Sequence, residues 1–139
     1  ITDPRIQPEG KGIRNVLSGE MPPEPGMARF SGAILRALSV PYHSGRPAAV
    51  LEPFALDMLR QQEVKLLIVD EIHNLLACTA RKQREVLNQL KYIGNQMQIP
   101  LIGVGTEDAW DAIKNDAQLA NRFEPYVLPL WARSFWRCW

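Results

Sequence analysis

The most regular hydrophobic pattern of the chain lies in its middle, where the apolar residues Leu66–Val69 run directly into Asp70 and Glu71. A short, continuous apolar run is typical of a strand that is buried on both faces, as in a parallel sheet. We therefore expect a buried strand over residues 65–71 that ends in two carboxylates. In open α/β sheets ligands bind beyond the carboxyl ends of the strands, so the two acids occupy the position of a ligand site.

Apolar residues at helical spacing predict three longer helices, over residues 27–39, 47–62 and 79–97. Pro41 should stop the first of these runs, and Pro53 should interrupt the second. The side chains expected in the core are Phe30, Ile34, Leu35 and Leu38 in the first helix, Val50, Phe54, Leu56 and Leu59 in the second, and Val86, Leu87, Leu90, Ile93 and Met97 in the third.

The rest of the pattern predicts shorter elements and sets the fold class. They are a possible short strand at 13–17, a loop over 72–76, a second buried strand over 101–106, a helix over 107–114 with Trp110 and Ile113 facing inward, a helical turn at 116–121 and a third strand over 125–130. Strands and helices that alternate from residue 65 onward imply parallel crossovers. The predicted fold class is therefore α/β.

The first 26 residues are rich in proline and glycine, which predicts irregular structure. Gly10 and Lys11 suggest a phosphate-binding loop, but the pattern G-x-x-x-x-G-K-[ST] also needs glycine at position 5 and serine or threonine at position 12. Arg5 and Gly12 stand there instead. We reject that interpretation, and residues 1–139 contain no other match.

Composition narrows the class of protein only a little. A chain of 139 residues makes one domain at most, and its net charge of +1 provides no overall electrostatic case for nucleic acid. No apolar run is long enough to span a membrane, and no signal peptide is present. Cys78 and Cys138 fit neither a zinc site nor a disulfide framework, which favours two separate thiols in a reducing cytoplasm. The chain begins with Ile1 and not with methionine, so we expect a fragment.

The acid pair has the pattern of a Walker B segment. There the first acid helps to hold Mg²⁺ and the second orients or deprotonates the attacking water, roles that would fall to Asp70 and Glu71. The alternative is an acid that caps the next helix. His73 has neither a nearby cysteine nor a second histidine at ligand spacing, which favours a loop residue or an outer residue of the site over a metal ligand.

Two further stretches are candidates for binding. Arg81, Lys82, Arg84 and Lys91 make the helix over 79–97 basic, which suits nucleic acid, although a solvated helix face is the favoured interpretation. The last residues, 131–139, combine three tryptophans with arginines. Such a tail suits a membrane surface or a partner, but we favour a non-native or poorly ordered end.

Three segments, taken in order, resemble one family closely. They are Asp70-Glu71-Ile72-His73-Asn74-Leu75-Leu76, then Ile99-Pro100-Leu101-Ile102-Gly103-Val104-Gly105-Thr106, then Gln118-Leu119-Ala120-Asn121-Arg122-Phe123-Glu124-Pro125, with Met21-Pro22-Pro23-Glu24-Pro25 in addition. The chain looks like the TniB-type transposition helper proteins, which are AAA+ ATPases of bacterial transposons related to TnsC and IstB. The resemblance covers roughly residues 20–131.

The resemblance implies a role for each matching residue. Asp70 would hold magnesium mainly through water, and Glu71 would be the catalytic glutamate. Thr106 would be the sensor 1 residue, which reaches the γ-phosphate or the attacking water; its alternative is a helix N-cap. Arg122 is the candidate arginine finger, offered to the nucleotide of a neighbouring subunit. Its alternative is a surface ion pair with Glu124.

The chain departs from the family pattern in two ways. The P-loop strand with its GK[ST] loop is absent from residues 1–139, and residues 132–139 do not continue into the helix and lid of the family. We therefore expect a Pro/Gly-rich segment over 1–26, a partial AAA+ domain over 20–131 and a tail of unknown role over 132–139. In the AAA+ sheet the P-loop strand lies beside the sensor 1 strand. Without it, residues 126–130 either pair with residues 101–105 or stay unpaired.

The function implied is that of an ATP-binding, Mg²⁺-dependent transposition helper in the cytoplasm. It would act with a transposase in the selection of target DNA, and its partners would be the transposase, double-stranded DNA and copies of itself. Because the phosphate-binding loop is absent, we expect residues 1–139 alone to bind ATP weakly and not to hydrolyse it. The alternatives are a non-catalytic interaction module and a decayed gene product.

Overall fold

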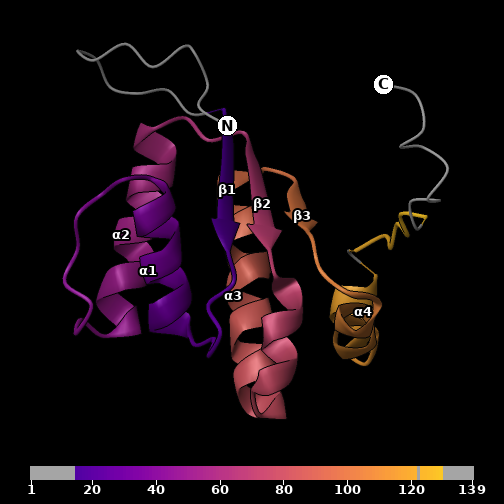
Figure 1. Ribbon diagram of the computed structural model, residues 1–139. Helices are drawn as coiled ribbons and strands as arrows, with labels where there is room; N and C mark the ends of the chain where they lie inside the picture. Colours follow the sequence, from indigo (N-terminus) through magenta and orange to yellow (C-terminus); the bar gives the residue numbers. More distant parts are fainter. Residues whose placement is uncertain (1–14, 122, 130–139) are drawn as a thin grey trace, which may run out of the picture.

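The computed structural model describes residues 15–121 and 123–129, and within them a three-stranded sheet with helices (Figure 1). The elements follow the order β1 (Val16–Glu20), α1 (Met27–Ala37), α2 (Ala48–Gln61), β2 (Leu66–Asp70), the 3₁₀-helix η1 (Ile72–Ala77), α3 (Ala80–Met97), β3 (Leu101–Gly103), α4 (Glu107–Lys114) and α5 (Ala117–Ala120). The α/β class predicted from the sequence is confirmed.

All strands of this sheet are parallel, and β2 lies between β1 and β3. The pairing of β1 with β2 sets Glu20 opposite Asp70, and that of β2 with β3 sets Val69 opposite Gly103. The first crossover contains α1 and α2, and the second contains η1 and α3. The expected short strand at 13–17 is thus real but begins at Val16, and its register with β2 adds a strand beside the acid pair.

The core lies on one face of the sheet, under α1, α2 and α3 (Figure 1). From the sheet, Leu17 and Leu67 contribute to it and are almost fully buried. The helices contribute a continuous set of aliphatic side chains, among them Leu35, Leu59 and Leu90. Burial of each such side chain is worth about 1.5–3 kcal/mol, so this single cluster holds the elements together.

The opposite face of the sheet is open within the part of the chain that the structure describes. Leu66 and Ile68 are only half-buried, and Val16 and Ile102 are 53% and 45% exposed. The expectation of a strand buried on both faces is therefore wrong for one of the two faces of β2. A continuous apolar run indicates that both faces are apolar, but the elements that cover each face are set by the rest of the chain.

The three longer helices confirm the predicted periodicity, with two corrections in α2. Pro53 lies inside α2 without interrupting it, exposed on the outer side of the helix. Val50 was expected in the core but is 45% exposed, whereas Leu51 and Ala55 are buried. Of the four side chains expected in the core, Leu56 and Leu59 are buried and Phe54 packs against the core partly buried, so only Val50 was misplaced.

Two other predictions are wrong. Residues 125–129 form no strand, and Tyr126 and Leu128 are 85% and 76% exposed. An apolar run needs a partner strand to make ladder hydrogen bonds, and here it finds none within the described residues. Residues 72–76, expected as a loop, belong to η1. The sheet therefore has three described strands, and residues 126–129 leave the outer edge of β3 unpaired.

Candidate functional site

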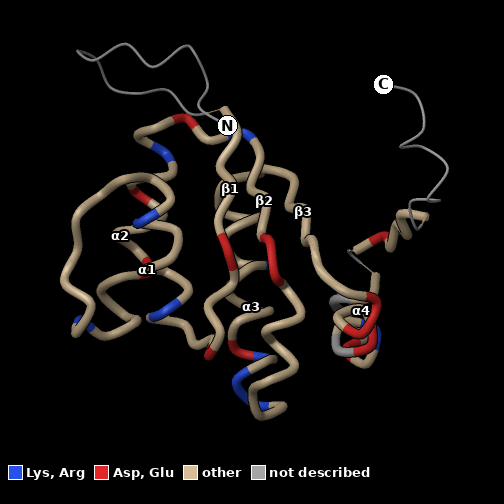
Figure 2. Tube along the Cα trace, in the orientation of Figure 1, with Lys and Arg blue, Asp and Glu red and all other residues tan. Residues whose placement is uncertain are grey.

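The carboxyl ends of the parallel strands meet at one edge of the sheet, and the predicted acids lie there. Asp70 ends β2, Glu71 follows it, and Glu20 on β1 is the register neighbour of Asp70. Figure 2 shows acidic segments side by side at the lower ends of β1 and β2. Sequence reasoning missed Glu20. Its only signal was an acid directly before Met21, and its place beside Asp70 follows from strand register.

Hydrogen bonds brace this edge from both neighbouring strands. The N–H of Met21 donates to the carbonyl of Asp70 at 2.8 Å, and the N–H of Ile72 donates to the carbonyl of Val104 at 2.9 Å. The side-chain amide of Asn74 in η1 donates to the carbonyl of Met21 at 2.8 Å. The segment that carries the acids is therefore tied to β1 on one side and to the chain after β3 on the other.

The backbone turns sharply between the two acids. Oδ1 of Asp70 accepts the N–H of Glu71 at 2.7 Å. Glu71 has φ 54° and ψ 34°, a left-handed conformation that is unfavourable for a residue with a side chain. The helix-cap alternative is met only in part, because Glu71 stands at the N-cap of η1 but makes no side-chain cap bond. The left-handed backbone at Glu71 ends the extended path of β2 directly after Asp70.

His73 lies in η1 and pairs with Glu71. Its Nε2 is 2.9 Å from Oε2 of Glu71, whose side chain is 48% exposed. No group of three or more His, Cys, Asp or Glu side chains in the described part of the chain is arranged to hold a metal ion. The acids therefore form no all-protein metal cage, and any cation here would take most of its ligands from water or from a phosphate.

Thr106 stands at the N-cap of α4, in the loop that follows β3 at the same edge of the sheet. Its side chain is exposed and makes no cap hydrogen bond, so the N-cap alternative holds for its position and not for its hydroxyl. Two glycines let this loop lie close to η1. A Cβ on Gly103 would come within 2.8 Å of Cδ1 of Ile72, and one on Gly105 within 2.9 Å of Cγ2 of the same residue.

Arg122 lies outside the described residues, so its role as an arginine finger and its alternative pairing with Glu124 both stay predictions. The tail over residues 131–139 and the pair Gly10 and Lys11 lie outside them as well. Of the four residues predicted for the site, the structure thus places Asp70, Glu71 and Thr106 at one edge.

The basic residues of α3 are partly compensated by acids. Arg81 pairs with Glu85 at 3.0 Å. The positive charge of Lys82 helps to lower the pKa of Glu24. Arg84 is exposed. Figure 2 shows basic segments with an acidic segment beside them at the lower end of α3, where the helix begins. The helix face is therefore a mixed surface, more basic than acidic.

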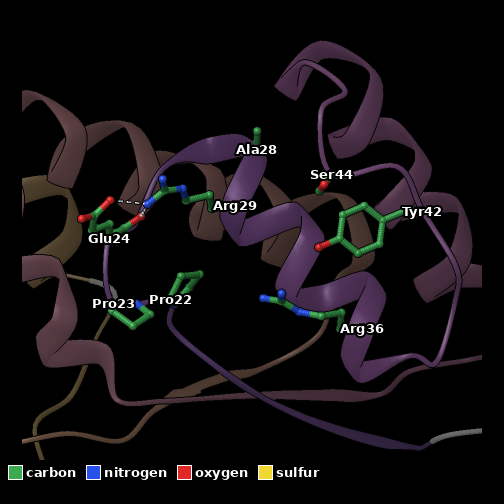
Figure 3. A pocket seen from close by; sticks show the side chains of 8 residues that line it. All are labelled: Pro22, Pro23, Glu24, Ala28, Arg29, Arg36, Tyr42 and Ser44. Carbon is green, nitrogen blue, oxygen red and sulfur yellow. Dashed lines mark hydrogen bonds and ion pairs between the residues drawn. The ribbon is translucent and has the colours of Figure 1, made fainter.

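A pocket of about 430 Å³ lies away from the acid pair, beside α1 (Figure 3). Its lining residues are Pro22, Pro23, Glu24, Ala28, Arg29, Arg36, Tyr42 and Ser44. Arg29 pairs with Glu24, and this hydrogen bond and charge lower the pKa of Glu24 below its usual value. None of the predicted site residues lines this pocket.

The remaining predictions concern the two cysteines and membrane-spanning segments. Cys78 is a free thiol, and Cys138 lies outside the described residues. None of the helices in the described part of the chain is both long enough and apolar enough to cross a membrane.

The fold has a counterpart among solved structures. The Aeropyrum pernix ORC2 protein, in its ADPNP and ADP complexes, superposes with a TM-score of 0.55 and 18% identity. The match covers 83% of this chain and 32% of that one, so the chain spans about a third of the length of that protein. At this identity the likeness shows the fold alone. The fold is that of an α/β domain with a parallel sheet.

The chain belongs to the TniB family. A family model described as bacterial TniB protein matches residues 1–133, nearly the whole sequence. No curated protein matches the chain.

Proposed function

We propose that this chain carries the water-activating side of the ATP site of a transposition helper, which acts with a transposase to select target DNA. One observation carries the proposal. Asp70 ends β2 and Glu71 follows it, directly beside the loop that holds Thr106, in a chain of the TniB family. Carboxylates and a hydroxyl at the carboxyl edge of a parallel sheet are the groups that phosphoryl transfer uses there.

The residues at this edge fit a hydrated Mg²⁺ and a nucleotide. Asp70 uses Oδ1 to accept the N–H of Glu71, and its Oδ2 has no hydrogen-bond partner among the described residues. Mg²⁺ in nucleotide sites takes one or two carboxylates, with water and phosphate oxygens as its other ligands, so one free carboxylate oxygen suffices. When bound, Mg²⁺–ATP supplies the electrophilic phosphorus and the neutralising charge.

Three side chains of this protein would then have separate roles in hydrolysis. Glu71 would orient the attacking water and accept its proton, since its Oε1 has no partner among the described residues. Thr106 has an exposed hydroxyl that makes no cap bond, which leaves it able to reach the γ-phosphate. Arg122 would serve the site of a neighbouring subunit. Residues 1–139 contain no G-x-x-x-x-G-K-[ST] loop, so we expect this polypeptide alone to bind ATP weakly.

The test compares three variants of the full-length gene product. Glu71→Gln should lower the ATPase kcat by about 100-fold or more while ATP binding and ATP-dependent assembly persist, because the amide cannot accept a proton. Asp70→Asn should weaken the dependence of ATP binding on Mg²⁺. The control is Glu63→Gln, an exposed acid in the turn before β2 and so at the opposite end of that strand from Asp70. Wild-type hydrolysis by Glu71→Gln would overturn the proposal and favour a non-catalytic interaction module.

The DNA partner is a separate part of the proposal and rests on α3. Neutralising Arg81, Lys82 and Arg84 together should weaken binding of double-stranded DNA. The slope of the logarithm of the binding constant against the logarithm of the salt concentration should become shallower by about 0.9 per lost phosphate contact. Arg46→Gln is the control, since Arg46 is also exposed but lies in the loop before α2. Unchanged binding and salt dependence in the triple variant would exclude α3 as the DNA surface.

A further inference from the structure

Asn74 in η1 joins Glu71 to a neighbouring part of the sheet through two hydrogen bonds. Its backbone N–H donates to the carbonyl of Glu71 at 2.9 Å, which is the i to i+3 bond of a 3₁₀ turn. Its side-chain nitrogen Nδ2 donates to the carbonyl of Met21 at 2.8 Å. Met21 directly follows β1 and lies 53 residues before Asn74 in the sequence, so the turn after β2 is fixed to a separate strand.

Met21 provides a buried anchor for this contact. Its side chain belongs to the core and is 1% exposed. Its N–H donates to the carbonyl of Asp70 at 2.8 Å, so both backbone polar groups of Met21 bind the same segment. The chain from Asp70 to Asn74 is therefore a closed loop, and both of its ends are held by one core residue.

Glu71 lies inside this loop, and both of its backbone polar groups are paired. Its N–H donates to Oδ1 of Asp70 at 2.7 Å, and its carbonyl accepts the N–H of Asn74. Its left-handed angles, φ 54° and ψ 34°, are unfavourable for a residue with a side chain and persist only where surrounding contacts hold them. Backbone angles set the direction of the Cα–Cβ bond. The bonds that hold this conformation therefore also fix the point from which the carboxylate extends.

From this arrangement we propose that Asn74 is a positioning residue for Glu71, an inference that rests on the proposed function of Glu71. Asn74 acts through the backbone and not on the reacting atoms. Its amide holds the first turn of η1 against Met21, and the turn holds Glu71 in its left-handed conformation. An amide suits this task because it donates to a carbonyl without carrying a charge. Loss of this donor should let Glu71 relax towards more favourable backbone angles.

A bond that only stabilises the fold has a close counterpart elsewhere in the chain. The side-chain amide of Gln62 donates to the carbonyl of Leu38 at 3.1 Å, and this bond is also partly buried and joins segments distant in sequence. Gln62 is the C-cap of α2 and precedes β2, so it lies at the opposite end of that strand from Asp70. Gln62→Ala removes the same kind of bond without changing the acid segment, and it is the control in both tests.

The first test measures amide hydrogen exchange by NMR in the 139-residue chain and needs no nucleotide. In Asn74→Ala the amide hydrogens of Met21 and Glu71 should exchange about two- to tenfold faster, relative to that of Leu90 in α3, than in the wild type. This is the ratio expected for the loss of one hydrogen bond of about ordinary net strength. In Gln62→Ala the ratio should stay unchanged. Unchanged relative exchange in Asn74→Ala, or an equal change in both variants, would overturn the proposal.

The second test measures ATPase kinetics in the full-length gene product. Asn74→Ala should lower kcat by about tenfold or more and leave KM for ATP within about threefold of wild type, because a misplaced Glu71 affects the reaction more than binding. Asn74→Asp keeps the shape of the side chain, but its carboxylate only accepts hydrogen bonds, so it should lower kcat at least as much. Gln62→Ala should change neither constant. Wild-type kcat in either Asn74 variant, or an equal loss in Gln62→Ala, would exclude the positioning role.

The failure of this proposal and that of the proposed function give different results. If Asn74→Ala loosens the acid segment but Glu71→Gln hydrolyses ATP like the wild type, the proposed function is wrong, and the role of Asn74 is wrong with it. If Glu71→Gln abolishes hydrolysis while both Asn74 variants keep the wild-type kcat, the proposed function stands and only the role of Asn74 is wrong.

Discussion

The buried side-chain amide of Gln89 on α3 donates to the hydroxyl of Ser31 on α1 at 2.7 Å. The Ser31 hydroxyl in turn donates to the carbonyl of Met27 at 2.9 Å. Ser31 is 0% and Gln89 2% exposed, the two buried polar residues of the core in the described chain. This bond joins two of the three helices that cover the buried face of the sheet, and its directional contact helps to set their relative position.

Removing this hydroxyl should destabilise the fold. Ser31→Ala leaves the Gln89 amide with only a 3.2 Å bond to the Met27 carbonyl. We expect a loss of about 1–3 kcal/mol in the free energy of unfolding, measured with urea. Adding Gln89→Leu removes the second polar group, so the double variant should lose less than the sum of the single losses. Ser44→Ala, an exposed hydroxyl, is the control, and strictly additive losses would contradict the expectation.

Gly32 should be intolerant of alanine because of Tyr42. A Cβ on Gly32 would lie 2.5 Å from the Tyr42 hydroxyl oxygen and 2.8 Å from Cζ. Gly32→Ala should therefore displace the ring and destabilise the protein. In a Tyr42→Ala background the same change should be stabilising by about 0.5–1 kcal/mol, since Gly32 lies inside α1 and alanine favours helices. Urea unfolding checks this reversal of sign, and Gly45→Ala, which meets nothing within 4 Å, is the control.

Gly103 and Ile72 should show coupled effects. The Cβ that alanine would add at Gly103 lies 2.8 Å from Cδ1 of Ile72, the atom that Ile72→Val removes. Gly103→Ala should cost about 1–3 kcal/mol by overpacking, and Ile72→Val about 0.5–1.5 kcal/mol through its lost methyl. The double variant should be more stable than the sum predicts. A double-mutant cycle from thermal unfolding measures the coupling, and a value near zero would contradict it.

The Arg29–Glu24 pair makes an acid-sensitive contribution. Its hydrogen bond and charge lower the pKa of Glu24 in the folded protein. The pair therefore stabilises the fold above the ordinary glutamate pKa of about 4.3, and this contribution disappears as pH falls through the lowered folded pKa. Arg29→Gln should return the Glu24 pKa towards its ordinary value, as followed by carboxyl NMR titration. Arg46→Gln should not, and high salt should reduce the shift because the pair is exposed.

Elements whose signal lies within their own residues were predictable from the sequence. The helix over Glu107–Lys114 was predicted to the residue, and the strand Leu66–Asp70 and the helix Ala80–Met97 within a residue or two. The apolar run at residues 125–130 has the same local signal, but residues 125–129 form no strand because pairing depends on a neighbour. The open face of β2 was unpredictable for the same reason.

The same distinction between local signals and neighbour-dependent contacts applies to the candidate site. The run that ends in Asp70 and Glu71 located the acids, because a buried strand must end where polar residues begin. The placement of Glu20 needed the register of β1, which Ser18 and Gly19 obscure in the pattern. His73 contacts Glu71 at a residue with a left-handed backbone, which glutamate seldom adopts, so spacing alone gave no indication of the contact.

The braces around the acid pair have a thermodynamic consequence. The bonds from Met21 to Asp70, from Asn74 to Met21 and from Ile72 to Val104 are all made between groups of the protein itself. The conformational entropy of ordering the acid segment is therefore lost when the protein folds and not when a ligand arrives. A ligand that binds at this edge therefore does not have to offset the entropy of ordering this segment, because the carboxylates are already held in place by the fold.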